Sequence, residues 1–192
     1  MVVVHGQQAG LEAHLRGVLS LLPAGAAIVQ LRDRCAGGRA LLALAESLRT
    51  LTAELGALLV INDRADVALA AGADGLQLPE RGLPVAQARG LVGPRILLGR
   101  SIHDPDGARR AATDGADYLV AAPVFEVPGK GEPLGLEGLR TICCASPLPT
   151  FALGGVTPER VRGCLDAGAH GVARLRDWQG HLPELAELVS RG

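Results

Sequence analysis

Short apolar runs alternate with longer amphipathic stretches along the whole chain. The apolar runs have the length of buried strands, and the amphipathic stretches repeat leucine and alanine at helical spacing, as in residues 41–48. The pattern predicts eight strands and eight helices in strict alternation. The expected strands cover residues 2–5, 27–31, 58–62, 75–78, 95–99, 117–121, 150–154 and 171–175. The expected helices cover residues 7–22, 39–55, 65–71, 84–92, 105–113, 136–142, 158–167 and 182–189.

Alternation of strand and helix predicts an α/β fold, with a parallel sheet covered by helices. Eight such units close into a (β/α)8 TIM barrel, and a chain of 192 residues would make one of minimal size, as a single domain over residues 1–192. Three similar segments, AGADG, DGADY and AGAHG, each end a helix on glycine before a strand and support this count. A doubly wound open sheet is the alternative, but HGQQAG after the first strand is a poor match to its glycine-rich fingerprint.

The composition favours a small ligand. The net charge of −1 and the 2% of aromatic residues argue against nucleic acid or an anionic membrane as partner. The start MVVVHGQQ does not resemble a signal peptide, and no apolar run is long enough to span a membrane. The four cysteines form no CxxC pair, so we expect buried free thiols and a cytoplasmic protein. A homo-oligomer remains open.

In a barrel the chemistry lies at the carboxyl ends of the strands. Gly154 and Gly155 follow the seventh expected strand, and a helix start at Thr157 comes next. This arrangement predicts a phosphate site of backbone N–H groups, with a simple tight turn as the alternative. Thr157 is expected to cap the helix at the same time.

The segment after the second strand carries three polar side chains on one face, those of Gln30, Arg32 and Arg34. Two guanidinium groups and an amide that project together suit a pyrophosphate. The alternative is an ion pair with Asp33 or Glu46.

Asn62 and Asp63 close the third strand, where a carboxylate beside an amide suits Mg²⁺ once substrate phosphates supply further oxygens. The alternative is that Asp63 caps the next helix. Lys130, the only lysine in the chain, lies in the loop after the sixth strand. Its compact ammonium group can follow a phosphate through a reaction, and the alternative is a solvated lysine on a loop.

Seven segments in order, QLRDR, INDRADVALAAGADGLQL, GRSIH, GADYLVAAPVF, PLGLEGL, FALGGV and AGAHGVA, resemble the thiamin phosphate synthase and TenI family. The resemblance implies a (β/α)8 barrel. The synthases join an aminopyrimidine, activated as its pyrophosphate, to a thiazole phosphate with the help of Mg²⁺. TenI-type members bind the same thiazole phosphate, and some are tautomerases.

The resemblance also implies roles for individual residues. The pyrophosphate would be bound by Gln30, Arg32, Lys130 and Ser101. Asn62 and Asp63 would contact the pyrimidine and the metal, and Gly155 the thiazole phosphate.

The chain departs from the synthase pattern at several of these places. Gly82 replaces a metal carboxylate and Gln77 a histidine, which leaves Asp63 for Mg²⁺, with Glu80 as a second candidate. Val127 and Gly129 replace two threonines before the lysine.

Two further departures concern the last strand and the tautomerase. Arg176, close to Arg174, stands where a serine is usual near the phosphate, and would bind the phosphate or fill the pocket. Pro123 occupies the position of a tautomerase histidine. His103 is the nearest replacement, unless it only makes a loop hydrogen bond.

Three functions follow from these residues. The first is an enzyme of thiamin biosynthesis, a synthase or alternatively a tautomerase. The second is a non-catalytic protein that binds thiazole phosphate or thiamin phosphate. The third is a different phosphate-binding barrel, such as an aldolase with a Schiff-base lysine, which ranks last because Lys130 lies well beyond a strand.

Overall fold

The computed structural model describes residues 1–5 and 10–174, which form two compact units, Met1–Leu76 and Gln77–Arg174. The first unit begins with β1 (Val2–Val4), α1 (Leu11–Leu19), β2 (Ile28–Leu31), α2 (Gly38–Glu54), β3 (Leu58–Asn62) and α3 (Ala65–Ala70). β4 (Gly75–Leu78) follows, and then α4 (Val85–Val92), β5 (Leu97–Ile102), α5 (Pro105–Thr113), β6 (Tyr118–Ala121), α6 (Gly135–Ala145), β7 (Thr150–Leu153), α7 (Pro158–Asp166) and β8 (Gly171–Ala173). The strands follow one another in sequence order from β1 to β8.

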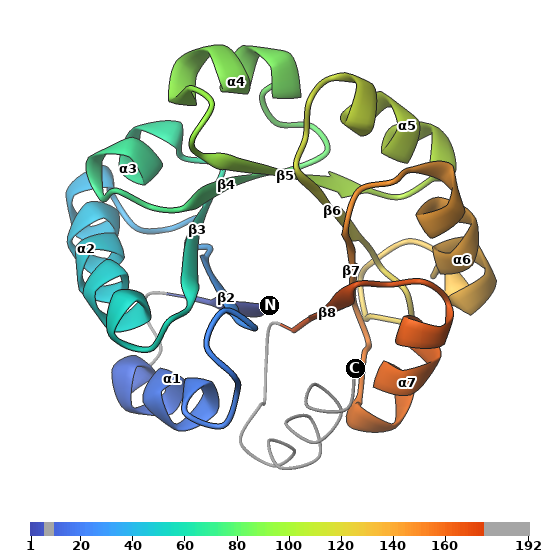
Figure 1. Cartoon of the computed structure of the whole chain (residues 1–192), viewed down its shortest axis with the longest axis horizontal. Helices are drawn as coiled ribbons and strands as arrows, with labels where there is room; N and C mark the ends of the chain where they lie inside the picture. Colours follow the sequence, from blue (N-terminus) through green and yellow to red (C-terminus); the bar gives the residue numbers. More distant parts are fainter. Residues whose placement is uncertain (6–9, 175–192) are drawn as a thin grey trace. The chain divides into compact units, whose positions relative to one another are not determined.

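In the first unit, β1, β2 and β3 are parallel neighbours, and Val29 of β2 pairs with Val2 on one side and Leu59 on the other. The helices α1, α2 and α3 lie along one side of these strands (Figure 1). Leu15 of α1 and Leu48 of α2 are fully buried, because each helix turns its apolar face to the strands.

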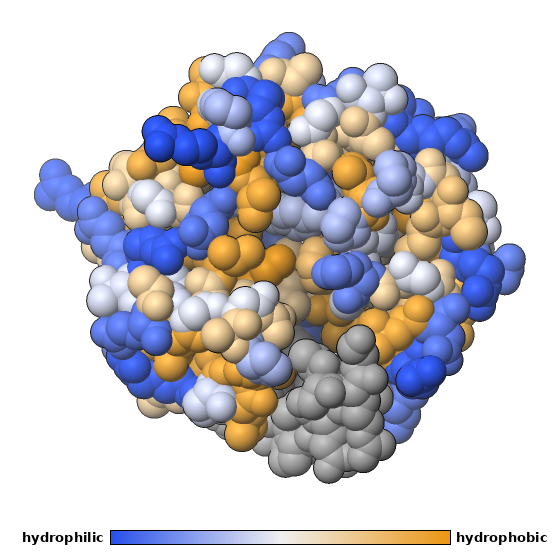
Figure 2. Space-filling model, viewed as in Figure 1, coloured by the Kyte–Doolittle hydropathy of each residue, from blue (hydrophilic) through white to orange (hydrophobic). Residues whose placement is uncertain are grey.

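In the second unit, β5 to β8 are parallel, and α5, α6 and α7 lie outside them (Figure 1). Leu98, Leu119 and Leu139 are fully buried between strands and helices. The surface is mixed: hydrophilic and hydrophobic residues are interspersed over the face in Figure 2. In the described part of the chain, no helix is both long and apolar enough to cross a membrane.

Two of the three similar segments share an interaction that explains their aspartate. Asp74 Oδ2 accepts hydrogen bonds from the backbone N–H of Leu59 at 2.7 Å and from Arg49 at 2.5 Å. Asp117 Oδ2 accepts the equivalent bonds from Leu98 N–H at 2.7 Å and Arg89 at 2.5 Å. Each carboxylate therefore ties the start of its strand to the neighbouring strand and to the helix that precedes that neighbouring strand.

The expected glycine turns are also confirmed: Gly72, Gly115 and Gly168 have φ of 60°, 89° and 96°. At such angles a residue with a Cβ is strained, so glycine ends each helix at these places.

Several predicted boundaries are wrong. β5 begins and ends later than the expected residues 95–99, so Ser101 lies within the strand. α6 extends to Ala145, and β8 ends at Ala173. Residues 7–9 of the first expected helix and all of the last expected helix, residues 182–189, lie outside the described residues.

The thiol prediction needs a correction too. All four cysteines are free, but only Cys164 is buried, whereas Cys35 and Cys144 are exposed. Both exposed thiols lie on turns or helix faces that point away from the core, which the spacing of cysteines does not reveal.

Candidate active site at the carboxyl ends of the strands

The polar residues of β2 behave differently from one another. Gln30 is only 5% exposed, and its Nε2 lies 3.3 Å from Met1 Sδ. Arg32 is half-buried, and burial followed by the charge of Arg34 lowers the pKa of its guanidinium. Asp33 Oδ1 accepts the backbone N–H groups of Cys35 and Ala36.

Asn62 ends β3, and Asp63 follows it with φ of 60°, a left-handed conformation that is uncommon for a residue with a side chain. The predicted alternative, in which Asp63 caps α3, is wrong: Arg64 is the N-cap residue and no side-chain cap bond forms. The Asp63 side chain is instead exposed at the strand end. Strained backbone of this kind is often found at functional sites.

Within the described residues, no group of three or more histidine, cysteine or acidic side chains could hold a metal. The described part of the chain therefore offers no complete set of protein ligands for a cation. It does fit Mg²⁺ of the kind that needs one or two carboxylates and takes its remaining oxygens from substrate phosphates and water. Asp63 has the exposed carboxylate for that role.

Gln77 of β4 and Ser101 of β5 meet in the second unit. Gln77 Nε2 donates to Ser101 Oγ at 3.0 Å, and the Gln77 side chain is buried while Ser101 is half-buried. The serine thus stands at the edge of the core, with the amide beneath it.

Two residues hold the loop after β4 in place: Arg100, which lies within β5, and His103, which directly follows that strand. Arg100 donates to the carbonyl oxygens of Glu80, at 2.6 Å, and Leu83, at 2.9 Å. His103 bonds the Ala122 carbonyl oxygen through Nδ1, and its Nε2 lies 3.3 Å from Glu80 Oε2. The expectation of a loop hydrogen bond for His103 is therefore confirmed, and Glu80 is engaged by the same imidazole.

Gly154 and Gly155 follow β7 with φ of 98° and 63°. A Cβ on Gly155 would lie 2.8 Å from both the Glu126 carbonyl oxygen and Phe125 Cβ. The backbone of this turn is therefore packed directly on the loop after β6, and only glycine fits. Thr157 is the N-cap residue of α7 and Pro158 its first residue, as predicted, although the Thr157 side chain makes no cap bond.

Arg160 is a residue that the sequence did not single out. Its guanidinium lies over the Phe125 ring, 4.4 Å from the centroid, and its Nη1 donates to the Gly155 carbonyl oxygen at 2.8 Å. Its position in the first turn of α7, directly after the glycine pair, is the signal that could have indicated it. Arg160 therefore holds the glycine turn against the loop after β6.

Of the remaining candidates, Lys130 lies on the loop after β6. Lys130 is exposed, and its N–H closes a turn with the Val127 carbonyl oxygen at 3.1 Å. Arg174 follows β8 directly. Arg176 lies outside the described residues.

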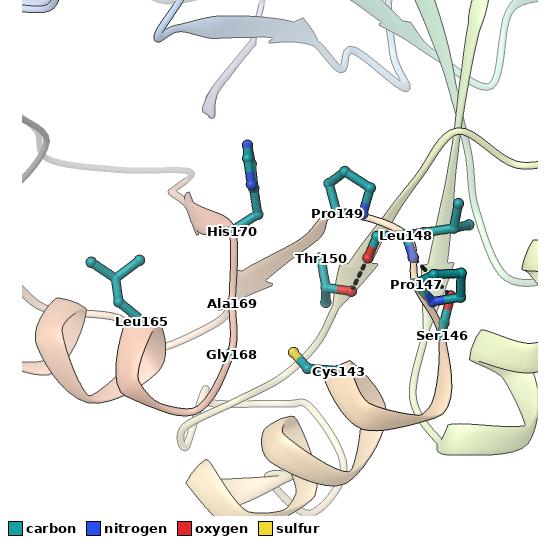
Figure 3. Close-up of a pocket in the computed structure, with 10 residues that line it drawn as sticks. All are labelled: Cys143, Ser146, Pro147, Leu148, Pro149, Thr150, Leu165, Gly168, Ala169 and His170. Carbon is teal, nitrogen blue, oxygen red and sulfur yellow. Dashed lines mark hydrogen bonds between the residues drawn. The ribbon is translucent and has the colours of Figure 1, made fainter. Parts of the chain in front are cut away.

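A hollow of about 580 Å³ lies at the other ends of β7 and β8 (Figure 3). Its lining includes Cys143, Thr150 at the start of β7, and His170 just before β8. It contains none of the predicted site residues. Amino ends of barrel strands generally serve stability, which separates this hollow from the candidate site.

Comparison with known proteins identifies the family. The family model described as thiamine monophosphate synthase, TMP-TENI, matches residues 1–177. The thiamine-phosphate synthase of Moorella thermoacetica is 41% identical over 99% of this chain and 95% of its own length. The putative thiamine-phosphate synthase of Geobacter sulfurreducens is 43% identical over 91% of this chain and 83% of its own.

A solved structure agrees with these sequences. Thiamine phosphate pyrophosphorylase from Pyrococcus furiosus superposes with a TM-score of 0.84 at 33% identity, covering 99% of this chain and 95% of the other. The predicted (β/α)8 fold class is thereby confirmed. Sequence, strand order and structural likeness lead to one assignment: the chain belongs to the TMP-TENI family, the thiamine monophosphate synthases.

Proposed function

We propose that this protein is a thiamine-phosphate synthase, a transferase that couples a pyrimidine pyrophosphate to a thiazole phosphate. A bond forms between the thiazole nitrogen and the pyrimidine methylene carbon, and the bond from that carbon to the pyrophosphate oxygen breaks. The observation that carries the proposal is the identity of 41% with a thiamine-phosphate synthase over nearly the whole of both chains. A cytoplasmic location is part of the proposal, supported by the four free thiols.

The second unit supports binding of the thiazole phosphate. The Gly154 and Gly155 turn directly precedes the N-terminus of α7, and backbone N–H groups at such a place commonly bind a phosphate. Arg160 holds this turn and adds a positive charge near it. A phosphate at this turn would place the thiazole ring at the carboxyl ends of the strands.

For the pyrophosphate we propose Arg32, Ser101 and Lys130. Arg32 directly follows β2 and Ser101 lies one residue before the end of β5, and both side chains are half-buried, where a hydrogen bond to an anion is stronger than in water. Lys130 is free to follow the leaving group, because only its backbone N–H is used in the loop turn. Gln30 would join them only if its contact with Met1 opened.

We also propose that Mg²⁺ takes part in the reaction, bound jointly by the protein and by oxygens of the substrate pyrophosphate. Asp63 would hold it with Asn62 beside it, and when bound it would supply positive charge that stabilises the departing pyrophosphate. Glu80 is a weaker candidate because His103 and Arg100 already fasten it and its loop.

The test is formation of thiamin phosphate by the purified protein, given the pyrimidine pyrophosphate, the thiazole phosphate and Mg²⁺. We expect turnover that stops when Mg²⁺ is chelated. Lys130→Ala should lower kcat by about tenfold or more, and Lys130→Arg should restore only part of it, because a guanidinium cannot replace the compact ammonium. Folded protein that binds thiazole phosphate without product would contradict the proposal and favour a binding protein.

A further inference from the structure

Two buried polar atoms of the second unit lack a hydrogen-bond partner and lie next to each other. They are Gln77 Oε1 and the hydroxyl oxygen of Tyr118. Both side chains are almost fully buried, at 2% and 5% exposure. A buried polar atom without a partner is uncommon and costly, so a pair of them in one place calls for a physical explanation.

Gly99 provides the space in which these side chains meet. A Cβ at Gly99 would lie 2.1 Å from Tyr118 Cζ and 2.3 Å from Gln77 Oε1. Gly99 is also the residue of β5 that pairs with Tyr118 of β6. The phenol end of Tyr118 and the amide oxygen of Gln77 therefore share one small volume next to Gly99. Any residue with a Cβ at position 99 would fill this volume.

The two atoms have complementary hydrogen-bonding character. Burial raises the pKa of Tyr118 well above its usual range, so the phenol keeps its proton at neutral pH and is a donor. An amide oxygen is only an acceptor. The Phe151 ring packs edge-on against Tyr118 with centroids 5.8 Å apart and limits how far the phenol can move away. A direct bond after a small rotation, or one buried water, would satisfy both atoms.

This pairing decides the direction of the hydrogen bond to Ser101. If Gln77 Oε1 accepts from the phenol, Nε2 must face the serine, as it does at 3.0 Å. Ser101 Oγ is then an acceptor toward the amide, and its own proton is available to another group. With the amide reversed, the serine proton would be given to Oε1, and an anion would meet only lone pairs.

We propose that Tyr118 is a positioning residue, which orients the Gln77 amide so that the Ser101 hydroxyl donates its proton to an oxygen of the substrate pyrophosphate. The proposal rests on the proposed function for the identity of that anion. It gives a reason for glutamine at position 77, because an amide has a donor and an acceptor on opposite sides and can link a buried phenol to the serine.

The test combines Tyr118→Phe, Ser101→Ala and the double variant. The readouts are kcat/KM for the pyrimidine pyrophosphate and the Kd for inorganic pyrophosphate by titration calorimetry. We expect Tyr118→Phe to weaken both by about threefold to tenfold in the native background. In the Ser101→Ala background the same change should have no effect beyond about twofold, because the phenol acts only through the serine.

Two controls separate positioning from packing. Tyr118→Phe keeps the ring and its packing on Phe151, so its melting temperature should fall by less than that of Phe151→Leu. Phe151→Leu disturbs the same ring packing without changing a polar atom, and should lower the melting temperature while leaving kcat/KM within about twofold.

Each outcome bears on the inference. The inference would be overturned if Tyr118→Phe had the same kcat/KM and pyrophosphate Kd as the native protein, or if it caused the same loss in the native and Ser101→Ala backgrounds. In either case, turnover by the native protein would still uphold the proposed function. Absence of turnover, with pyrophosphate still bound and the coupling still present, would refute the proposed function and leave the inference standing. Native protein that does not bind pyrophosphate at all overturns the inference.

Discussion

The imidazole of His103 lies with its Nε2 3.3 Å from Glu80 Oε2 and its Nδ1 on the Ala122 carbonyl oxygen. One ring therefore connects the loop after β4 to the end of β6. The Glu80 carboxylate is part of this connection, which makes it a structural group of the loop. Of the two candidate metal ligands, Asp63 and Glu80, only Asp63 has an exposed carboxylate that is not used in this connection.

From this follows a prediction on metal dependence. Asp63→Asn should raise the Mg²⁺ concentration for half-maximal activity by at least about tenfold, because the charge is lost while asparagine tolerates the left-handed backbone at this position. Glu80→Gln is the matched control and should stay within about twofold, since the amide can still bond His103. Activity titrations with Mg²⁺ measure both, and a larger effect at position 80 would identify Glu80 as the ligand.

Gly155 should be irreplaceable for thiazole phosphate binding. Gly155→Ala places a Cβ 2.8 Å from two atoms of the loop after β6, so the turn must shift and binding should weaken by at least about tenfold. Gly72→Ala is the control: its φ of 60° is close to the 63° of Gly155, but nothing lies within 4 Å of its Cβ. It should cost about 1–2 kcal/mol of stability and leave affinity unchanged. Similar affinity losses in both variants would mean that strain, and not the turn's position, matters.

Arg160 should support the phosphate site through Phe125 and Gly155. Arg160→Met removes the stacked cation and the bond to the Gly155 carbonyl oxygen, and should weaken thiazole phosphate binding by about threefold to tenfold. Arg162→Met, on the same helix, loses only an exposed pair with Asp166 and should have no effect. Calorimetric Kd values for the three proteins decide the matter. Full rescue by Arg160→Lys would show that charge alone is needed, without the planar stack.

Stability should fall in alkaline solution because of Tyr118, the only tyrosine in the sequence. Burial raises its pKa in the folded state above the ordinary value of 10.0. The unfolded chain therefore releases this proton first, so the contribution to stability is complete below pH 10 and is lost at about 1.4 kcal/mol per pH unit above it. Urea midpoints from pH 8 to 11 measure the effect, and Tyr118→Phe should show a shallower decline. Parallel curves for the two proteins would contradict the prediction.

Local patterns in the sequence were sufficient for the elements. Apolar runs and helical spacing placed every described strand and helix to within a few residues, because burial of one face requires that periodicity. Among the strands the largest shift was in β5, where GRSI continues the strand beyond the apolar residues. Pairing with β6 extends a strand through polar residues, and pairing partners cannot be read from one segment alone.

The candidate site was only partly predictable. The glycine pair after β7 and the polar ends of β2 and β3 were identified because strand ends are local features. Tyr118, Phe125 and Arg160 were not, since their importance depends on what they touch. Phe125 and Arg160 are 35 positions apart in the chain, yet the guanidinium covers the ring.

The sequence by itself determined the order of elements, the family and the polar character of the strand ends, because each depends on the identity and spacing of neighbouring residues. The tertiary structure decided which polar groups are engaged and which are open. It assigned Glu80 to His103, released Asp63 from its capping role, and brought the phenol of Tyr118 to the amide of Gln77. These outcomes depend on distances between atoms of different elements, and packing alone sets those distances.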